Sequence, residues 1–263
     1  MEKINKTNYG NWMPIKLVYI IVAGLILAAV LTFLTFHFSC HWTSKTLAIA
    51  FLIFMTISMV YALAVRHTFS FSGGGLMGKV HEYLTNHIQW DGNGKLLDVG
   101  CGAGALTIRC AKKFPQSECT GIDYWGMKWD YSKKMCENNA KLEGVADRCV
   151  FMKGDANNLD FGDETFDVVV SNFVYHEVNG ILDRESLLKE TLRVLKKGGV
   201  FALQDLFGQR LMYGDFNVIV EHLKSEGIEE INYIKDAGKE IPVPSWLRMP
   251  AMLNGVGIIY GKK

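Results

Sequence analysis

The stretch that most constrains the fold runs from Lys95 to Phe114 and reads "KLLDVGCGAGALTIRCAKKF". An apolar segment ends in a loop with glycines at positions 100, 102 and 104, and a helical pattern follows. A strand, a glycine-rich turn and a helix N-terminus in this order form a nucleotide-binding unit, because glycine tolerates the turn and lets a ligand approach the backbone. The spacing Gly100-x-Gly102-x-x-Ala105 satisfies the dinucleotide pattern, which is a weak signal in a chain with 26 glycines.

The rest of the chain after Lys95 alternates short apolar segments with helical patterns. The predicted strands are "KLLDV", "ECTGID", "CVFMKG", "FDVVVSN", "GVFALQDL", "EEINYIK" and "VGIIYGK". The predicted helices of this region cover residues 105–113, 130–143, 184–195 and 214–225, and a further helical pattern over residues 76–88 precedes it. This alternation predicts an α/β fold, a doubly wound seven-stranded Rossmann-like sheet with a buried parallel core. The last two strands have no helix between them, so we expect them to pair as an antiparallel edge.

Two apolar runs precede this region. Residues 15–38 carry one charge, Lys16, and residues 46–65 carry none. Each run is long enough to cross a bilayer as a helix, and the connection "HFSCHWTSK" is too short for anything but a tight turn. We therefore predict a transmembrane α-helical hairpin. The alternatives for the first run are a cleaved signal peptide and a lipoprotein-type cleavage before Cys40, and both fit less well because a second span follows and His37 stands where Leu would be wanted.

Positive charges predict the orientation of the hairpin. Lysines 3, 6 and 16 precede the first run, and Arg66 and Lys79 follow the second, whereas the turn offers only Lys45. Basic residues favour the cytoplasmic side, so we expect an integral membrane protein with both termini and the α/β region after the hairpin in the cytoplasm. The predicted domains are a membrane anchor over residues 1–70 and an α/β domain over residues 71–263.

Composition excludes several other classes of protein. The formal net charge is +1, so no strong field attracts nucleic acid. The six cysteines form no CxxC pair and no Cys/His spacing typical of zinc, so no metal site is predicted. His37, Cys40 and His41 are more simply explained as turn and interface residues than as metal ligands.

Two carboxylates indicate what the glycine loop binds. Asp123 ends the predicted strand "ECTGID", where an acid accepts hydrogen bonds from ribose hydroxyls. Asp98 stands directly before the loop, where it would repel a pyrophosphate but attract a cationic ligand. S-adenosylmethionine carries an ammonium and a sulfonium and no phosphate, so it suits "DVGCGAG" better than NAD does.

At this point the sequence resembles a known family. From about Gly75 to Lys263 the chain is similar to class I S-adenosylmethionine-dependent methyltransferases, through "LLDVGCGAGALT", "GID", "KGDANNLDFGDETFDVVVSNFVYHEV" and "ETLRVLKKGGVFALQDL". The run "GDA…LDF…FDVVVS…RVLKKGG" resembles the methyltransferases of quinone biosynthesis and related small-molecule enzymes. The two predicted spans are a departure from that family pattern.

The resemblance implies a role for each matching residue. The loop residues would wrap the methionine part of the cofactor. Asp98 would face its ammonium group, Asp123 would hold the ribose, and Asp155 would accept a hydrogen bond from the adenine amino group. The end of the fourth strand would face the methyl group. The implied cofactor-binding residues are Asp98, Gly100, Cys101, Gly102, Gly104, Asp123, Tyr124, Trp125, Asp155, Ala156, Ser171 and Asn172. The implied cofactor is S-adenosyl-L-methionine, with S-adenosyl-L-homocysteine as product.

Methyl transfer requires that the acceptor is aligned with the methyl group of the cofactor. It requires a base only if the attacking atom of the acceptor must lose a proton. "NFVYHEV" places Tyr175 and His176 after the fourth strand, and His176 has a suitable pKa range for a base. Helix capping is the simpler alternative for His176. Further substrate-side candidates are Asp205, Phe207, the apolar segment 205–216 and the long connection 239–255, which would serve as a lid, a membrane contact or a dimer contact.

The predicted acceptor is a small lipophilic or lipid-like molecule in the membrane, with no nucleic acid partner. No Pro-Pro-aromatic motif follows the fourth strand, which disfavours methylation of the amines of bases and glutamine. Two other functions stay open at this point: a non-catalytic module that binds S-adenosylmethionine, and an NAD-type oxidoreductase, which Asp98 disfavours. The acceptor atom and the oligomeric state are left open.

Overall fold

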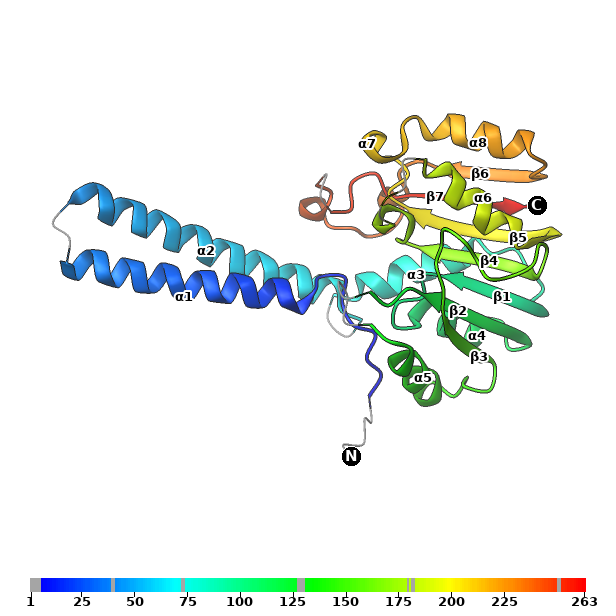
Figure 1. Cartoon of the computed structure of the whole chain (residues 1–263), viewed down its shortest axis with the longest axis horizontal. Coiled ribbons are helices and arrows are strands. Elements are labelled where there is room, and N and C mark those ends of the chain that lie inside the picture. The colour runs from blue at the N-terminus through cyan, green and yellow to red at the C-terminus, as the bar shows by residue number, and fades with distance from the viewer. Residues whose placement is uncertain are drawn as a thin grey trace. The chain divides into compact units, whose positions relative to one another are not determined.

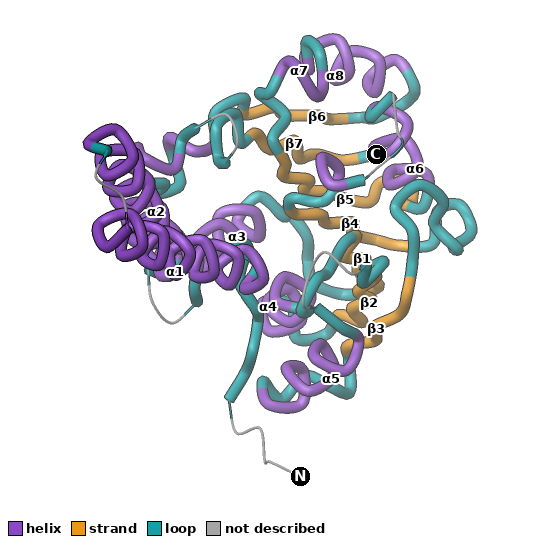
Figure 2. The backbone as a smooth tube through the Cα atoms, turned by 60° about the vertical axis from the view of Figure 1, so that its left-hand side comes forward, coloured by secondary structure: helices purple, strands orange, loops and turns teal. Residues whose placement is uncertain are grey.

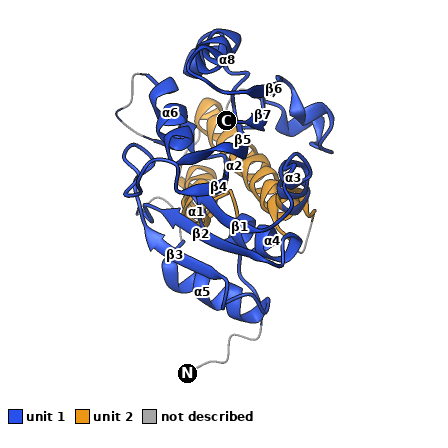
Figure 3. Cartoon of the chain, turned by 90° about the vertical axis from the view of Figure 1, so that its right-hand side faces the viewer, with its two compact units in different colours: residues 1–10, 78–263 blue, residues 11–77 orange. Residues whose placement is uncertain are grey.

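The computed structural model describes residues 6–38, 41–71, 74–126, 131–178, 180, 183–249 and 252–263. The chain divides into two compact units, residues 11–77 and a second unit made of residues 1–10 and 78–263 (Figure 3). Residues 6–10, which lie within the predicted anchor, group with the α/β unit. Cys40 lies outside the described residues, as do Asp130 and residues 72–73.

The second unit is built on one seven-stranded sheet in the order β3-β2-β1-β4-β5-β7-β6 (Figure 1). Its strands are β1 (Gly94–Val99), β2 (Ser117–Asp123), β3 (Cys149–Lys153), β4 (Phe166–Asn172), β5 (Leu195–Asp205), β6 (Glu230–Ile234) and β7 (Gly257–Lys262). The first five strands are parallel, and β7 pairs antiparallel with both β5 and β6. The parallel strands change direction of winding between β1 and β4, so their carboxyl ends form the edge where such sheets bind ligands.

Helices cover both faces of this sheet. They are α3 (Leu76–Asn86), α4 (Ala105–Lys113), α5 (Lys133–Leu142), α6 (Glu185–Arg193), α7 (Arg210–Tyr213) and α8 (Phe216–Ser225), with 3-10 turns at Tyr175–Glu177, Ala237–Lys239 and Ser245–Leu247. The helices α4 and α5 lie on one face, and α6 and α8 on the other (Figure 2). Side-chain caps start two of them: Ser132 accepts from Met135 N–H, and Asp215 accepts from Asn217 N–H.

The predicted doubly wound sheet is confirmed, and most element boundaries agree within two residues. The clearest difference is β5, which begins at Leu195, whereas the expected strand starts at Gly199. Leu195 pairs with Phe166, the register then shifts, and pairing resumes between Val168 and Val200. The segment "LKKGG" therefore resembles a turn in sequence but is absorbed into the strand as an irregularity.

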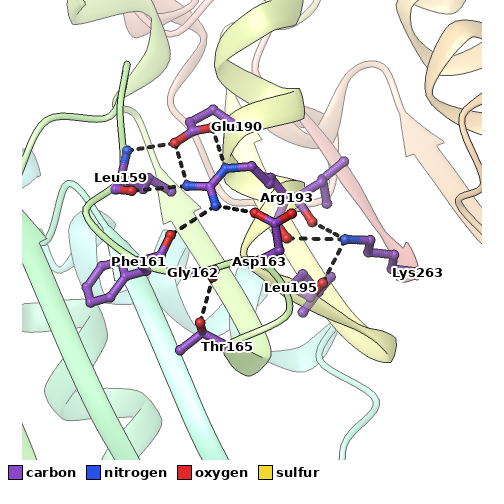
Figure 4. Close-up of polar contacts among 10 residues, drawn as sticks. Leu159, Phe161, Gly162, Asp163, Thr165, Glu190, Arg193, Leu195 and Lys263 are labelled. Atoms are coloured by element: carbon purple, nitrogen blue, oxygen red, sulfur yellow. Dashed lines mark hydrogen bonds and ion pairs between the residues drawn. The ribbon is translucent and has the colours of Figure 1, made fainter.

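Arg193, in the sequence run "RVLKKGG", fastens α6 to the connection between β3 and β4 (Figure 4). Its guanidinium donates to Glu190 and Asp163 at 2.6–2.9 Å and to the carbonyls of Leu159 and Phe161. Lys263 donates to the carbonyls of Leu192 and Leu195, both at 2.8 Å. These contacts use the full fork of the guanidinium, so this part of the family motif supports the fold.

The first unit is a hairpin of two helices, α1 (Ile15–Phe38) and α2 (Trp42–Phe69). Small residues allow them to pack closely: Ala28 and Ala62 are buried, and a Cβ added at Gly24 would lie 2.4 Å from Met55 Cε. Thr32 Oγ1 lies 2.8 Å from the carbonyl of Ala28 and 3.2 Å from that of Ala48 on the other helix. The start of α1 matches the prediction, and α2 is longer at both ends than the predicted 46–65.

The two ends of the hairpin are joined by hydrogen bonds. Arg66 Nη1 donates to the carbonyl of Met13 at 2.6 Å, and Asn11 Nδ2 donates to the carbonyl of Arg66 at 2.8 Å. Both helices are long and apolar enough to cross a membrane by length and composition, and only 11% and 17% of their most apolar windows are buried within the structure. Their large apolar side chains, such as Ile20, Phe33 and Phe54, are mostly exposed.

Candidate functional site

The loop after β1 requires its glycines. Gly100, Gly102 and Gly104 have φ values of 78°, 57° and 80°, in the left-handed region that other residues rarely adopt. A Cβ at Gly100 would also lie 2.1 Å from Val174 Cγ2, so the loop packs against the segment after β4. The backbone N–H groups of Gly100 and Cys101 both donate to the carbonyl of Ile122, which holds the loop against β2.

Asp98 is a buried carboxylate with a spare oxygen. Its Oδ2 accepts from Thr107 Oγ1 on α4 at 2.6 Å, whereas its Oδ1 is buried with no hydrogen-bond partner among the described residues. Burial raises the pKa of Asp98 to about 7, against the opposing effect of the Thr107 hydrogen bond. A cation that binds beside Asp98 would therefore supply the partner that its Oδ1 lacks.

Asp123, at the end of β2, connects two turns. Its Oδ2 accepts from the N–H of Gly102 at 2.8 Å, and its Oδ1 accepts from the N–H of Trp125 at 2.7 Å. The indole N–H of Trp125 in turn donates to the carbonyl of Gly102 at 2.9 Å, from a residue with φ of 46°. Burial raises the pKa of Asp123, offset in part by these backbone hydrogen bonds. The predicted ribose acid thus lies directly beside the glycine loop.

The residues predicted for the adenine side lie at the ends of β2 and β3. These strand ends are neighbours, because Asp123 pairs with Lys153 and the N–H of Gly154 donates to the carbonyl of Asp123. Asp155 is exposed, and its Oδ1 accepts from the backbone and side-chain nitrogens of Asn157. Ala156 is half-buried.

Tyr124 is also exposed, and Lys153 Nζ lies 4.9 Å from the centre of its ring. The phenol ring therefore stands at the open side of the site, whereas Trp125 lies against the glycine loop.

The end of β4 shows which predicted residues face a ligand. Ser171 is fully buried, and its hydroxyl donates to the carbonyl of Val99 at 2.9 Å, so it holds β4 to β1. Asn172 has a buried Oδ1 without a hydrogen-bond partner among the described residues. Its pairing partner on β5 is Gln204, which is fully buried with neither side-chain oxygen nor nitrogen bonded within the described part of the chain. Buried polar atoms in this state are rare and indicate a site for a polar ligand or water.

His176 forms a pair with Asp205 at the ends of β4 and β5. Its Nδ1 lies 2.7 Å from Asp205 Oδ1, and its Nε2 lies 3.5 Å from Glu177 Oε1. Asp205 is fully buried and also accepts from the backbone N–H groups of His176 and Leu206. Burial lowers the pKa of His176, but the charge of Asp205 and the hydrogen bonds to Asp205 and Glu177 outweigh it and raise this pKa to about 9.

Tyr175 lies in the core. Its side chain is fully buried and its hydroxyl is 3.1 Å from Thr191 Oγ1 on α6. Burial raises the pKa of Tyr175 well above its usual value. The structure therefore gives this residue, predicted as catalytic, the position of a brace between the β4 end and α6, and we leave it out of the proposed catalytic set.

Sequence reasoning missed Gln204 altogether. Its position is marked in the sequence only by a polar pair, Gln204 and Asp205, at the end of an apolar strand. It also missed Asn139 on α5, a 98% buried amide whose Nδ2 donates to the carbonyl of Ala103 in the glycine loop. A polar residue inside a helix gives no signal of such a contact.

The residues present fit S-adenosylmethionine. The glycine loop has left-handed turns, Asp123 stands at the adjoining strand end, and the buried Asp98 and Asn172 oxygens have no partner among the described residues, which a cationic, hydrogen-bonding ligand would supply. Among the described residues, no group of three or more His, Cys, Asp or Glu is placed to hold a metal ion.

Comparison with known proteins agrees with this geometry. Residues 97–203 match a family model described as "Methyltransferase domain". The chain is 33% identical over 126 residues to the sterol 24-C-methyltransferase of Aspergillus fumigatus, covering 48% of this chain and 31% of that protein. It is 30% identical over 118 residues to the ubiquinone/menaquinone biosynthesis C-methyltransferase of Geotalea daltonii, covering 44% of this chain and 47% of that protein. The chain thus spans between about a third and half of the length of these relatives.

Among solved structures, the [4+2]-cyclase SpnF is similar in fold, with a TM-score of 0.51 and 19% identity over 70% of this chain and 80% of that one. Such a likeness shows the fold and not the reaction. Residues 97–203 thus match a methyltransferase-domain family, and the sheet order of the α/β unit agrees with the Rossmann-like methyltransferase fold.

Proposed function

We propose that this protein is a membrane-anchored methyltransferase that moves the methyl group of S-adenosylmethionine to a small lipophilic acceptor at the cytoplasmic face of a membrane. The observation that carries the proposal is the arrangement at the carboxyl ends of the parallel strands. A loop suited to the cofactor follows β1 and β2, and the His176–Asp205 pair follows β4 and β5 of the same sheet.

The proposed cofactor contacts come from four strand ends. Gly100, Cys101, Gly102 and Gly104 would let the loop wrap the methionine part, with the spare oxygen of Asp98 toward its positive charge. Asp123 would hold the ribose, Tyr124 and Trp125 would flank the adenine, and Asp155 and Ala156 would contact its edge. Asn172 would lie near the methyl group, while Ser171 keeps its strand in place through Val99.

When bound, the cofactor supplies a methyl group on a sulfonium, which is already a good electrophile. The protein has to align the acceptor, exclude water and deal with its proton. His176 is held by Asp205 with Nδ1 as the donor, because an ionised carboxylate only accepts. With a pKa of about 9, His176 carries a proton at neutral pH, so only its minor neutral form would accept the proton that the acceptor loses. Above about pH 9 it becomes a base.

The lipophilic acceptor rests on two observations. The two relatives described above are named for sterol and for ubiquinone or menaquinone C-methylation, and both kinds of molecule are lipophilic. The α1–α2 hairpin has the length and composition of two membrane spans. An enzyme held at the membrane meets an acceptor concentrated there, which a freely soluble acceptor would not require.

The proposed orientation places the methyltransferase domain and both chain ends in the cytoplasm. Lys6 and Lys16 precede or open α1, Arg66 lies in the last turn of α2, and Lys45 is the lysine nearest the turn. This excess of positive charge at the ends remote from the turn favours their retention on the cytoplasmic side.

The experiment that tests the proposal compares the pH profile of methyl transfer in the full chain and in Asp205→Asn, with labelled S-adenosylmethionine in liposomes. Removing the negative charge lowers the pKa of His176. We expect the variant to lose activity and its remaining pH transition to move to lower pH. A non-catalytic binding module would bind the cofactor and show no transfer at any pH, and an NAD-type oxidoreductase would bind NAD instead.

A further inference from the structure

The amino-terminal strap, which we define as residues 6–10, lies against the methyltransferase domain. The backbone N–H of Asn8 donates to Asn139 Oδ1 at 2.8 Å, and Asn139 Nδ2 donates to the carbonyl of Asn8 at 2.7 Å. The hydroxyl of Tyr9 is 3.0 Å from Glu143 Oε1 near the end of α5. The strap is therefore joined to the C-terminal end of α5, although more than 130 residues separate them in sequence.

Asn139 connects the strap to the glycine loop. The same Nδ2 that donates to Asn8 also donates to the carbonyl of Ala103 at 3.0 Å. Asn139 is only 2% exposed, so its amide is removed from water and depends on these three bonds. Without the strap, a buried amide would lose two of its partners beside the loop that the cofactor needs.

Tyr131 forms a second connection. A Cβ placed on Gly10 would lie 2.4 Å from Tyr131 Cε1, and one placed on Gly102 would lie 3.4 Å from the other edge of the same ring. The ring therefore lies between the strap and the central glycine of the loop. Gly10 has φ of 68°, so both its conformation and the closeness of Tyr131 require glycine.

We propose that the amino-terminal strap belongs to the cofactor site, where it pre-orders the glycine loop through Asn139 and Tyr131 and thereby raises the affinity for S-adenosylmethionine. Asn139 acts as a positioning residue, because its contacts are with the strap and the loop. Ordering the loop before binding spares the ligand that cost. The strap ends where the hairpin unit begins, at Asn11, so the segment that leads into the hairpin also supports the site. The proposal rests on the proposed cofactor.

The test measures binding of S-adenosylhomocysteine by calorimetry to the full chain in detergent micelles. Asn8→Pro removes the N–H that donates to Asn139, and Asn139→Ala removes the amide itself. We expect each variant to weaken binding by about tenfold, the effect of one or two lost hydrogen bonds. The double variant should be little weaker than Asn139→Ala alone, because both changes break the same connection.

Two control variants separate the strap from general damage. Asn8→Ala keeps the backbone groups that Asn139 binds and removes only a side-chain bond to Gly10 N–H, so we expect binding within twofold of the unchanged chain. Lys134→Ala changes an exposed position on α5 and should behave likewise. Amide hydrogen exchange without ligand supplies a second readout: Gly102 to Gly104 should exchange faster in Asn8→Pro than in Asn8→Ala.

Each outcome of these measurements either supports or overturns the inference. If Asn8→Pro binds as tightly as Asn8→Ala and its loop amides exchange at the same rate, the strap plays no part in the site and the inference is overturned. Tighter binding by Asn8→Pro would also overturn it, because the strap would then obstruct the site. If the unchanged chain does not bind S-adenosylhomocysteine, the proposed function fails as well, which distinguishes the two failures.

Discussion

His176 Nδ1 lies 2.7 Å from Oδ1 of Asp205, a carboxylate with no exposed surface. Two further backbone N–H groups, of His176 and Leu206, donate to the same carboxylate. These bonds hold the Asp205 carboxylate in place and fix the plane of the imidazole. Nε2 is left on the side of Glu177, with 17% of the His176 side chain exposed. Residues at the ends of β4 and β5 therefore fix the position of the His176 imidazole and raise its pKa.

The pair makes stability depend on pH. The pKa of His176 is raised from 6.5 to about 9 in the folded protein. A raised folded pKa stabilises the charged form, so this contribution is complete below about pH 6.5 and is lost as the pH rises through 9. The shift corresponds to about 3 kcal/mol. We expect His176→Gln to reduce the difference in free energy of unfolding between pH 6 and pH 9.5 by this order. The same pH dependence in both proteins would contradict the account.

We expect Asp98 to release a proton when S-adenosylhomocysteine binds. Its pKa is raised to about 7 by burial, and a cation near the spare oxygen would favour the ionised form. Affinity for S-adenosylhomocysteine should therefore rise with pH up to about 7, and binding near pH 6.5 should release part of a proton. Calorimetry in buffers of different ionisation enthalpy measures this directly. In Asp98→Asn the release from this site should vanish, and an unchanged release would assign it to another group.

Replacement of Gln204 is expected to lower the activity of the protein without lowering its stability. Its amide is fully buried with no hydrogen bond among the described residues, which is a cost in the unliganded protein. Replacement by an apolar side chain of similar size removes that cost. We expect Gln204→Leu to unfold at the same temperature as the unchanged chain or a few degrees higher, while kcat/KM for methyl transfer falls. A lower unfolding temperature with unchanged kinetics would show that the amide serves the fold.

Cysteine labelling tests the topology of the hairpin. In a Cys40→Ser background, a membrane-impermeant thiol reagent outside intact cells should modify Ser44→Cys, near the turn, and not Ser225→Cys on the exposed end of α8. Permeabilised cells provide the control, since both positions should then react. If only Ser225→Cys is labelled in intact cells, the proposed orientation is reversed. If neither cysteine is labelled in intact cells, the turn of the hairpin does not face the outside, and the proposed topology is wrong.

Much of the sheet could be predicted because buried parallel strands are short apolar runs bounded by turn residues. "FDVVVSN" corresponds residue for residue to β4, and Ala105 to Lys113 to α4. The early start of β5 was not predictable in this way, because Gly198 and Gly199 suggest a turn, whereas pairing with Phe166 decides the strand.

The residues of the candidate site also include some that the sequence could predict and some that it could not. Asp98, Asp123 and the glycines stand in a local order that reports their chemistry, so sequence alone placed them beside one another. The bonds of Asn139 to Asn8 and Ala103 join residues remote in sequence through backbone groups, which carry no residue-type signal. The sequence also gives no signal that the hydroxyl of Tyr175, next to His176, contacts Thr191 within the core.

The central claim is methyl transfer to a lipophilic acceptor. The most direct measurement follows methyl-labelled S-adenosylmethionine incubated with the full chain in liposomes that contain a lipid extract, with Asp123→Ala as the control, because it removes the acid that holds Gly102 and Trp125. The account predicts label in the organic phase, and a clear loss of that label with the variant as cofactor affinity falls by about 1–3 kcal/mol. Label confined to water-soluble products would contradict the proposed acceptor, and no label in either phase from a chain that binds S-adenosylhomocysteine would contradict the proposed reaction.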